Sequence, residues 1–239
     1  MKNLLSKRTL NKYSRQIILK DVGIIGQKKI FNSKILVVGA GGLGSPVIDL
    51  LVRAGVGFLG VIEDDKVDYS NLHRQTLYDY NDVGKFKSDV IKKKIKLIND
   101  KIKLKIFKER AKDKNLSKIL PKFDIIVDGT DNFPTKFLLN KYSLKYRKKL
   151  VIGAISKFDG HIFSFDFSQK KIPCLNCFYQ GMPSDEILNC EAEGILGPTA
   201  NVIGALQANE VLKIILGLNG IIKNNILIVD LLNLTSRKV

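Results

Sequence analysis

The sequence is poor in several residue types, and it lacks features that mark a disulfide-stabilised secreted protein or a membrane protein. Its 239 residues include no tryptophan, two methionines, two histidines and three cysteines. An odd cysteine count fits a reducing compartment better than a disulfide framework. Apolar runs are also short, since none reaches the roughly 18–20 residues that a membrane helix needs. Residues 1–8 have no apolar core of signal-peptide length. We therefore expect a cytoplasmic protein with no membrane partner.

Arginine is scarce relative to lysine. The chain has 40 basic and 23 acidic residues and a net charge of +17, yet only seven of the basic residues are arginine. A basic surface can attract nucleic acid or another polyanion. Here lysine is spread along the chain beside abundant isoleucine and asparagine. We favour a codon bias that places lysines on solvated faces, and we regard a nucleic-acid partner as the weaker hypothesis.

Short apolar runs alternate with helical stretches along most of the chain. This alternation predicts an α/β fold with a doubly wound, Rossmann-like, mainly parallel sheet. After residue 155 the alternating pattern at 160–167 predicts antiparallel strands. We expect a single domain over 1–239, with a nucleotide-binding core at about 33–155 and a C-terminal part at about 156–239. Residues 1–12 are expected to be frayed. The predicted strands are 34–38, 58–62, 103–107, 123–128, 150–154, 160–167 and 225–232, and the predicted helices are 45–54, 85–99, 112–120, 133–146 and 204–216, with one or two more in 13–32 interrupted at Gly23 and Gly26.

A glycine-rich turn lies between the first predicted strand and the next helix. Gly39, Gly41 and Gly44 follow a G-x-G-x-x-G pattern, with Gly42 beside them. Glycine permits a tight turn and lets phosphate approach the backbone, and the helix N-terminus offers free N–H groups. Asp65 follows the next strand, where an acid can accept hydrogen bonds from ribose hydroxyls. The pattern predicts a nucleotide site and by itself suits NAD as well as ATP.

The residues that follow Asp65 favour ATP. Cations and a carboxylate able to hold Mg²⁺ suit a triphosphate better than a nicotinamide, since nucleotidyl transfer needs charge neutralised on phosphate oxygens. Forming an acyl-adenylate needs no general base, because the attacking carboxylate is already an anion. We therefore expect the two histidines, His73 and His161, to be structural. The added polar groups are Asn71, Arg74, Gln75, Lys85, Lys87 and Asp131.

Four segments in order resemble one known family. They are YSRQIIL at 13–19, GAGGLGS at 39–45, SNLHRQ at 70–75 and GTDN at 129–132. Together they are similar to the ThiF/MoeB/HesA family, the bacterial group related to ubiquitin-activating E1 enzymes, over roughly 13–235.

The resemblance implies a role for each matching residue. Asp65 would bind the ribose, and Asp131 would coordinate Mg²⁺ beside the α-phosphate. Arg15 resembles an arginine finger that enters the active site of the other subunit of a homodimer. The residues expected to contact the phosphates are Asn71, Arg74 and Lys87.

The resemblance also implies a substrate and partners. The substrate would be the Gly-Gly tail of a ubiquitin-like sulfur carrier, of ThiS type in thiamine thiazole synthesis or MoaD type in molybdopterin synthesis. Overall similarity slightly favours the thiazole branch. A cysteine desulfurase or a rhodanese would supply sulfur.

Three other hypotheses remain. An E1-like tRNA-modifying dehydratase would suit the basic charge. An NAD-dependent oxidoreductase is disfavoured by residues 70–75. A non-catalytic relative that only docks a ubiquitin-like protein is disfavoured by intact candidates at Arg15, Arg74, Lys87 and Asp131.

The cysteines depart from the family pattern. Cys174 and Cys177 have the spacing of half a zinc site, but the family usually supplies a second Cys-x-x-Cys near its C-terminus and this sequence shows none. We favour reduced thiols over bound zinc, with a redox-active pair as a third hypothesis. Cys190 matches the position where related enzymes carry a cysteine that joins covalently to the carrier. We weigh a catalytic thiol against a passive one evenly.

Overall fold

A single eight-stranded sheet forms the centre of the protein. The computed structural model describes residues 6–180 and 194–239, so the predicted catalytic thiol of Cys190 lies outside the described residues. The strands are β1 Lys34–Val38, β2 Phe58–Ile62, β3 Lys103–Phe107, β4 Ile125–Asp128, β5 Lys149–Ser156, β6 Asp159–Asp166, β7 Ile226–Asp230 and β8 Thr235–Lys238. Their order is β3-β2-β1-β4-β5-β6-β7-β8. The first five strands run parallel and the last three pair antiparallel. The predicted fold class is confirmed.

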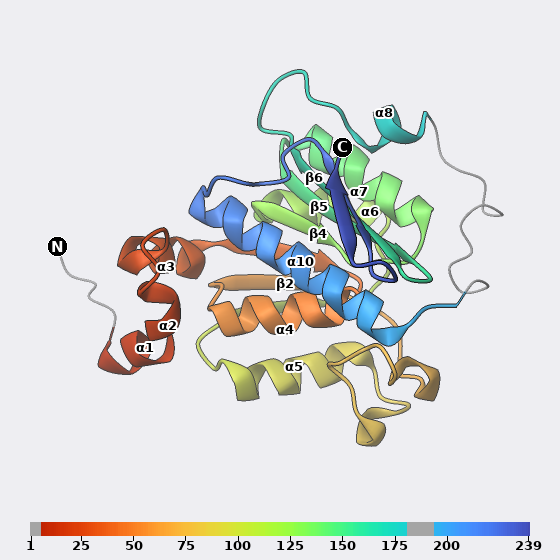
Figure 1. Ribbon diagram of the computed structural model, residues 1–239. Coiled ribbons are helices and arrows are strands. Elements are labelled where there is room, and N and C mark those ends of the chain that lie inside the picture. Colours follow the sequence, from red (N-terminus) through yellow and green to blue (C-terminus); the bar gives the residue numbers. More distant parts are fainter. Residues whose placement is uncertain (1–5, 181–193) are drawn as a thin grey trace.

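Helices cover both faces of the sheet (Figure 1). They are α1 Lys7–Lys12, α2 Ser14–Ile17, α3 Gly23–Asn32, α4 Gly44–Ala54, α5 Lys87–Ile98, α6 Asp113–Ile119, α7 Phe133–Lys145, α8 Leu175–Tyr179 and α10 Gly197–Leu216, with short 3₁₀ turns η1 Tyr69–Asn71, η2 Tyr80–Asp82 and η3 Leu120–Lys122. Because successive side chains of a strand point to opposite faces, β1 contributes to two cores. Ile35 and Val37 share a core with residues of α4, α5 and α10, whereas Leu36 and Val38 share one with residues of α6 and α7. None of the helices in the described residues is long and apolar enough to cross a membrane.

The long helix α10 begins seven residues earlier than the sequence predicted. The sequence predicts a start at Gly204, but the helix runs from Gly197 to Leu216. Pro198 fits the first turn, where its missing N–H has no partner to lose. Gly204 lies inside the helix because a Cβ there would meet Pro46 Cγ and lie 2.6 Å from the Leu43 carbonyl oxygen. The glycine therefore permits close packing of α10 on α4 rather than breaking a helix.

Two other predictions differ from the structure at the chain ends. Residues 7–12, expected to be frayed, form α1, whose first turn is capped by a hydrogen bond from Thr9 N to Ser6 Oγ of 3.2 Å. Residues 235–238 form the exposed edge strand β8, which the sequence did not predict. Neither segment has a strong hydrophobic period: α1 is stabilised by its local cap, whereas β8 depends on pairing with β7.

The topology fixes where a ligand can bind. The chain passes outward from β1 to β2 and β3, then returns to place β4 on the other side of β1. In open α/β sheets, a crevice forms at the carboxyl ends of the strands where the order reverses. The turns after β1 and β4 meet there, since a Cβ on Gly129 would lie 2.9 Å from the Gly39 carbonyl oxygen.

Candidate nucleotide-binding site

A cleft of about 1390 Å³ opens at this edge of the sheet. This exceeds the 300–1,000 Å³ usual for small-ligand pockets, so an extended ligand or two ligands can enter. Most of the residues predicted to bind nucleotide line it. They are Gly39, Gly41, Gly42, Asp65, Arg74, Gln75, Lys87 and Asp131. The predicted site residues that are not among the lining residues are Gly44, Asn71, Arg15, Cys174 and Cys177.

The positions of the loop that hold glycine do so for different local reasons. Gly39 has a φ of +82°, a conformation that glycine adopts without strain. A Cβ on Gly44 would collide with the Gly39 carbonyl oxygen. A Cβ on Gly41, in contrast, would meet only Gln75 Nε2, at 3.6 Å. Gly39 and Gly44 are thus needed by the loop itself, whereas Gly41 leaves space on the cleft side where a phosphate could approach the backbone.

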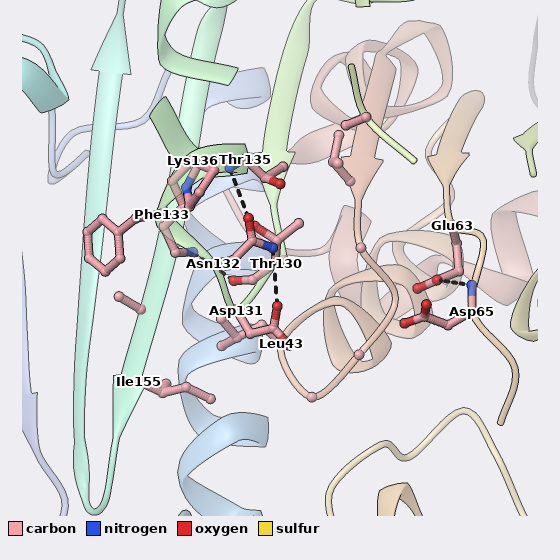
Figure 2. A pocket seen from close by; sticks show the side chains of 18 of the residues that line it. Leu43, Glu63, Asp65, Thr130, Asp131, Asn132, Phe133, Thr135, Lys136 and Ile155 are labelled. Atoms are coloured by element: carbon pink, nitrogen blue, oxygen red, sulfur yellow. Dashed lines mark hydrogen bonds between the residues drawn. The ribbon is translucent and has the colours of Figure 1, made fainter. Parts of the chain in front are cut away.

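Two buried side chains that sequence reasoning missed hold this loop. Glu63, at the end of β2, is 6% exposed. Its Oε2 accepts a hydrogen bond from Ala40 N, and its Oε1 accepts one from Asp65 N, both at 2.8 Å (Figure 2 shows the second). Tyr78 Oη donates to the Ala40 carbonyl oxygen at 2.9 Å. Burial, together with the nearby charge of Glu63, raises the pKa of Tyr78, so the phenol stays a donor. The available signal for Glu63 was its position two residues before Asp65, the predicted ribose-binding acid.

Asp65 and Lys87 form a pair on one wall of the cleft. Lys87 Nζ lies 3.4 Å from Asp65 Oδ2, and Lys87 N donates to the Asp65 carbonyl oxygen at 2.9 Å. The side chain of Lys87 is 6% exposed, whereas that of Asp65 is 55% exposed. Among the described residues, this long contact is the one hydrogen bond that the Lys87 ammonium makes. A buried ammonium with three donors and one distant partner has capacity for an anionic ligand.

On the other side of the glycine turn, Asp131 projects from a rigidly held loop (Figure 2). Lys136, which the sequence analysis did not single out, donates from Nζ to Asp128 Oδ2, to the Thr130 carbonyl oxygen and to the Gly153 carbonyl oxygen, at 2.8, 2.7 and 2.7 Å. Asp128 Oδ1 accepts from Thr130 Oγ1 at 2.6 Å. Asp128 is fully buried and Lys136 is 4% exposed. This buried ion pair fixes the backbone just before Asp131, which is itself exposed.

The segment after η1 supplies Arg74 and Gln75 to the cleft. Arg74 Nη1 donates to the Ser70 carbonyl oxygen at 2.9 Å and contacts His73 Nε2 at 2.8 Å. Gln75 is 4% exposed, and its Oε1 has no hydrogen-bond partner among the described residues. A buried acceptor without a partner is costly, so it calls for a donor from a ligand or water. Asn71, predicted to contact phosphate, accepts a hydrogen bond from Asp68 N on its Oδ1 at 3.3 Å and caps η1.

Arg15 lies far from the cleft of its own chain. It is exposed on α2, where the neighbouring Gln16 donates from Nε2 to the Ala54 carbonyl oxygen at 3.2 Å. Ala54 ends α4, and the glycine loop begins it. With eleven residues in α4, the two ends are about 16 Å apart. Arg15 therefore has no access to the cleft of its own chain by side-chain rotation alone.

His161 and the cysteine pair lie at or beside the cleft. His161 lines the cleft from β6, and burial lowers its pKa from the ordinary 6.5. The Sγ atoms of Cys174 and Cys177 are 3.6 Å apart. Burial opposes the charged form of Cys174, but hydrogen bonds from Cys177 and Asn140 outweigh it and leave the pKa of this thiol below its usual value. The pair adjoins the cleft through α8, whose Phe178 and Tyr179 line it.

Similarity to known proteins agrees with this geometry. The ThiF family matches residues 13–239. The chain is 39% identical over 238 residues to the sulfur carrier protein adenylyltransferase of Thermus thermophilus, covering 98% of this chain and 88% of the relative. It is 37% identical over 234 residues to the probable molybdopterin-synthase adenylyltransferase of Gracilaria tenuistipitata var. liui, covering 98% of this chain and 65% of that relative. Among solved structures, E. coli MccB with ATP is 25% identical with a TM-score of 0.83, over 96% of this chain and 71% of that one.

The fold and the cleft together define a Rossmann-like protein with a nucleotide-binding crevice at the switch point of its sheet. The family and sequence matches span nearly the whole chain and assign the protein to one family of this fold. The protein belongs to the ThiF family, which confirms the resemblance noted in the sequence.

Proposed function

We propose that this protein uses ATP to adenylate the C-terminal Gly-Gly carboxylate of a ubiquitin-like sulfur-carrier protein, releasing pyrophosphate. The names of the relatives support this class of reaction: one is an adenylyltransferase of a sulfur carrier, and another is a probable molybdopterin-synthase adenylyltransferase. In the reaction, a carboxylate oxygen of the carrier attacks the α-phosphorus of ATP. The bond between the α- and β-phosphates breaks, and pyrophosphate leaves with the electron pair.

The observation that carries the proposal is the under-satisfied ammonium of Lys87 beside Asp65. The two side chains lie 3.4 Å apart on one wall of the cleft. In this arrangement Asp65 accepts hydrogen bonds from the ribose while Lys87 and Arg74 neutralise the phosphates. Preorganised cations of this kind stabilise charge that develops on phosphate oxygens in the transition state. The unpartnered Gln75 Oε1 supplies an acceptor for a donor group of the nucleotide.

Asp131 fits a magnesium ligand by its chemistry. Its carboxylate faces the cleft, and among the described residues its hydrogen-bond partner is Asn132 Nδ2, at 3.3 Å. One carboxylate oxygen thus remains for a hard cation, which prefers oxygen ligands and binds through one or two carboxylates plus phosphates. Glu63 fits less well, because both of its oxygens already accept backbone hydrogen bonds. When bound, Mg²⁺ would neutralise charge on the phosphates, while Asp131 holds it.

The partners follow from the same proposal. The cleft extends from the glycine loop to Phe178, Tyr179 and Ile195, and this breadth supports entry of a narrow Gly-Gly tail beside the nucleotide. We also propose that the protein is a homodimer in which Arg15 reaches the cleft of the other subunit, since Arg15 lies far from its own. Sulfur transfer from a cysteine desulfurase or a rhodanese would follow adenylation.

Exchange of radioactive pyrophosphate into ATP tests the proposal. We expect exchange with a ThiS-type or MoaD-type carrier and none with the same carrier lacking its Gly-Gly tail. Asp131→Ala should lower the exchange rate about 10²- to 10³-fold, whereas Asp100→Ala, which removes an exposed carboxylate outside the cleft lining, should not. Exchange that depends on tRNA rather than on either carrier would overturn the proposal.

A further inference from the structure

One buried cation of the cleft wall has no part in the adenylation described above. Lys136, in the first turn of α7, lines the cleft but is only 4% exposed. Its ammonium donates to Asp128 Oδ2, to the Thr130 carbonyl oxygen and to the Gly153 carbonyl oxygen, at 2.8, 2.7 and 2.7 Å. A lysine ammonium has three donors, and these contacts use all of them. Unlike Lys87, it has no donor left for a phosphate.

The contacts of Lys136 lie where the pairing between β4 and β5 stops. The parallel ladder ends at Asp128 and Ile152, and it joins no residue of the loop after β4 to β5. Lys136 supplies the next link, because its ammonium binds the Thr130 carbonyl on the β4 side and the Gly153 carbonyl on the β5 side. One side chain thus holds the two strand ends together.

Asp131 lies between two held residues of that loop. On one side, Lys136 binds the carbonyl oxygen of Thr130. On the other side, Asn132 caps α7, since its Oδ1 accepts a hydrogen bond from Thr135 N at 2.9 Å. Asp131 itself is exposed and lines the cleft. Its carboxylate therefore enters the cleft from a backbone that is fixed before any ligand arrives.

A second helix holds the base of the loop independently of Lys136. Gln207 of α10 is fully buried, and its Nε2 donates to the Asp128 carbonyl oxygen at 2.9 Å. Loss of the Lys136 ammonium would consequently free the carbonyls of Thr130 and Gly153 while the end of β4 stays in place. The effect of such a change should be confined to the loop that carries Asp131.

Stability alone gives a weak reason for the buried pair of Lys136 and Asp128. Replacing both partners of a buried ion pair with uncharged groups of similar size is often neutral or stabilising, whereas removing one partner leaves an uncompensated charge and is strongly destabilising. An apolar side chain, however, cannot hold two backbone carbonyls. The chemistry of the pair therefore indicates positioning of the loop.

We propose that Lys136 is a positioning residue that sets the affinity of Asp131 for Mg²⁺ and thereby the metal-dependent binding of ATP. Groups that hold a ligating carboxylate from behind alter metal affinity or activity by about 10- to 100-fold when they are changed. Lys136 acts through the Thr130 carbonyl next to Asp131 and not by contact with the metal, since its donors are already used. This inference rests on the proposed function, because it takes Asp131 as the metal ligand.

Hydrogen exchange of the protein without ligands is the first test. Lys136→Met alone should be strongly destabilised, whereas the double variant Asp128→Asn with Lys136→Met removes both charges and should unfold near the wild-type temperature. In the folded double variant, the amides of residues 129–132 should exchange about 10-fold faster than in the wild type, because hydrogen bonds to a charged donor are lost. The amides of α5 should be unchanged.

Calorimetric titration of ATP at a series of Mg²⁺ concentrations is the second test. In the double variant, the Mg²⁺ concentration that gives half of the metal-dependent ATP binding should rise about 10- to 100-fold. Lys141→Met is the matched control. Lys141 belongs to the same helix and also lies 2.8 Å from a carboxylate oxygen, that of Asp113, but its side chain is 64% exposed. It should shift the Mg²⁺ dependence by less than about twofold.

Placing the double variant in an Asp131→Ala background separates positioning from a general structural effect. The additional shift should vanish there, because an absent carboxylate cannot be positioned. The inference is overturned if the shift persists in that background, or if the double variant keeps the wild-type Mg²⁺ dependence. A wild-type protein that binds ATP with Mg²⁺ but shows no carrier-dependent exchange would overturn the proposed adenylation alone, and one whose ATP binding is independent of Mg²⁺ would overturn this inference.

Discussion

Replacing Glu63 with glutamine should loosen the glycine loop without changing its side-chain volume. Glu63 accepts one hydrogen bond from Ala40 N and one from Asp65 N, both at 2.8 Å. Glutamine keeps one acceptor oxygen, but its NH₂ group would face the second backbone N–H, donor against donor. The variant thus tests whether a single buried carboxylate positions both the glycine turn and Asp65.

The magnitude follows from the hydrogen bonds that change. Hydrogen bonds to charged groups contribute about 1.5–3 kcal/mol, and neutral ones about 1 kcal/mol. Losing one charged bond and weakening the other should cost about 2–4 kcal/mol. For a chain of this size that corresponds to a fall in Tm of roughly 5–15 °C. The KM for ATP should rise as well, because Ala40 and Asp65 shift together.

Urea and thermal unfolding followed by circular dichroism measure the first effect, and pyrophosphate exchange at varied ATP measures the second. Asp64→Asn is the matched control for stability. Its side chain is 40% exposed and lies 3.8 Å from Arg110 Nε, a contact that contributes below about 1 kcal/mol. If Glu63→Gln unfolds like the control and keeps the wild-type KM for ATP, the assigned role of Glu63 is wrong.

Three further predictions test the cleft. Lys87→Ala should lower kcat/KM for ATP about 100-fold or more with the fold intact, while Lys85→Ala, whose side chain is 56% exposed, should stay within about twofold in the same exchange assay. Gly41→Ala should fold normally and weaken ATP binding in calorimetry, because its Cβ meets only Gln75 Nε2 at 3.6 Å, whereas Gly44→Ala should destabilise the protein in urea, because its Cβ collides with the loop backbone. Burial lowers the pKa of His161 from 6.5, so the folded state binds fewer protons than the unfolded state. Stability is therefore present above pH 6.5 and should fall as the pH drops from about 6.5 towards 5, and His161→Asn should flatten that part of the curve in urea titrations.

Each of these predictions has an outcome that contradicts it. Equal losses in the two lysine variants would mean that surface charge, and not the buried ammonium, attracts the nucleotide. Wild-type ATP affinity in Gly41→Ala would place the phosphates elsewhere in the cleft. An unchanged pH profile in His161→Asn would assign the acid sensitivity to other groups.

The sequence by itself determined the parallel core and the position of the candidate nucleotide site. The apolar runs that form β1, β2 and β4 are local signals. Each strand is buried on both faces, so it appears in the sequence as a continuous apolar run whichever strands it pairs with. The glycine turn and Asp65 are local too, because backbone conformation and chain direction place them at one edge of the sheet. Most predicted nucleotide-binding residues accordingly line one cleft.

Only the tertiary structure decided how these residues are supported. In the local sequence Glu63 is marked only by its position two residues before Asp65, which does not reveal its partners, and nothing distinguishes Lys136 from the many other lysines of the chain. Their roles depend on partners brought close by folding: Ala40 N for Glu63 and Asp128 for Lys136. The same holds for Gly204, which resembles a helix breaker in the sequence and is a packing contact in the fold. The hydrophobic period of a segment predicts which of its faces is buried. Which residues pack against that face depends on contacts between residues far apart in the chain.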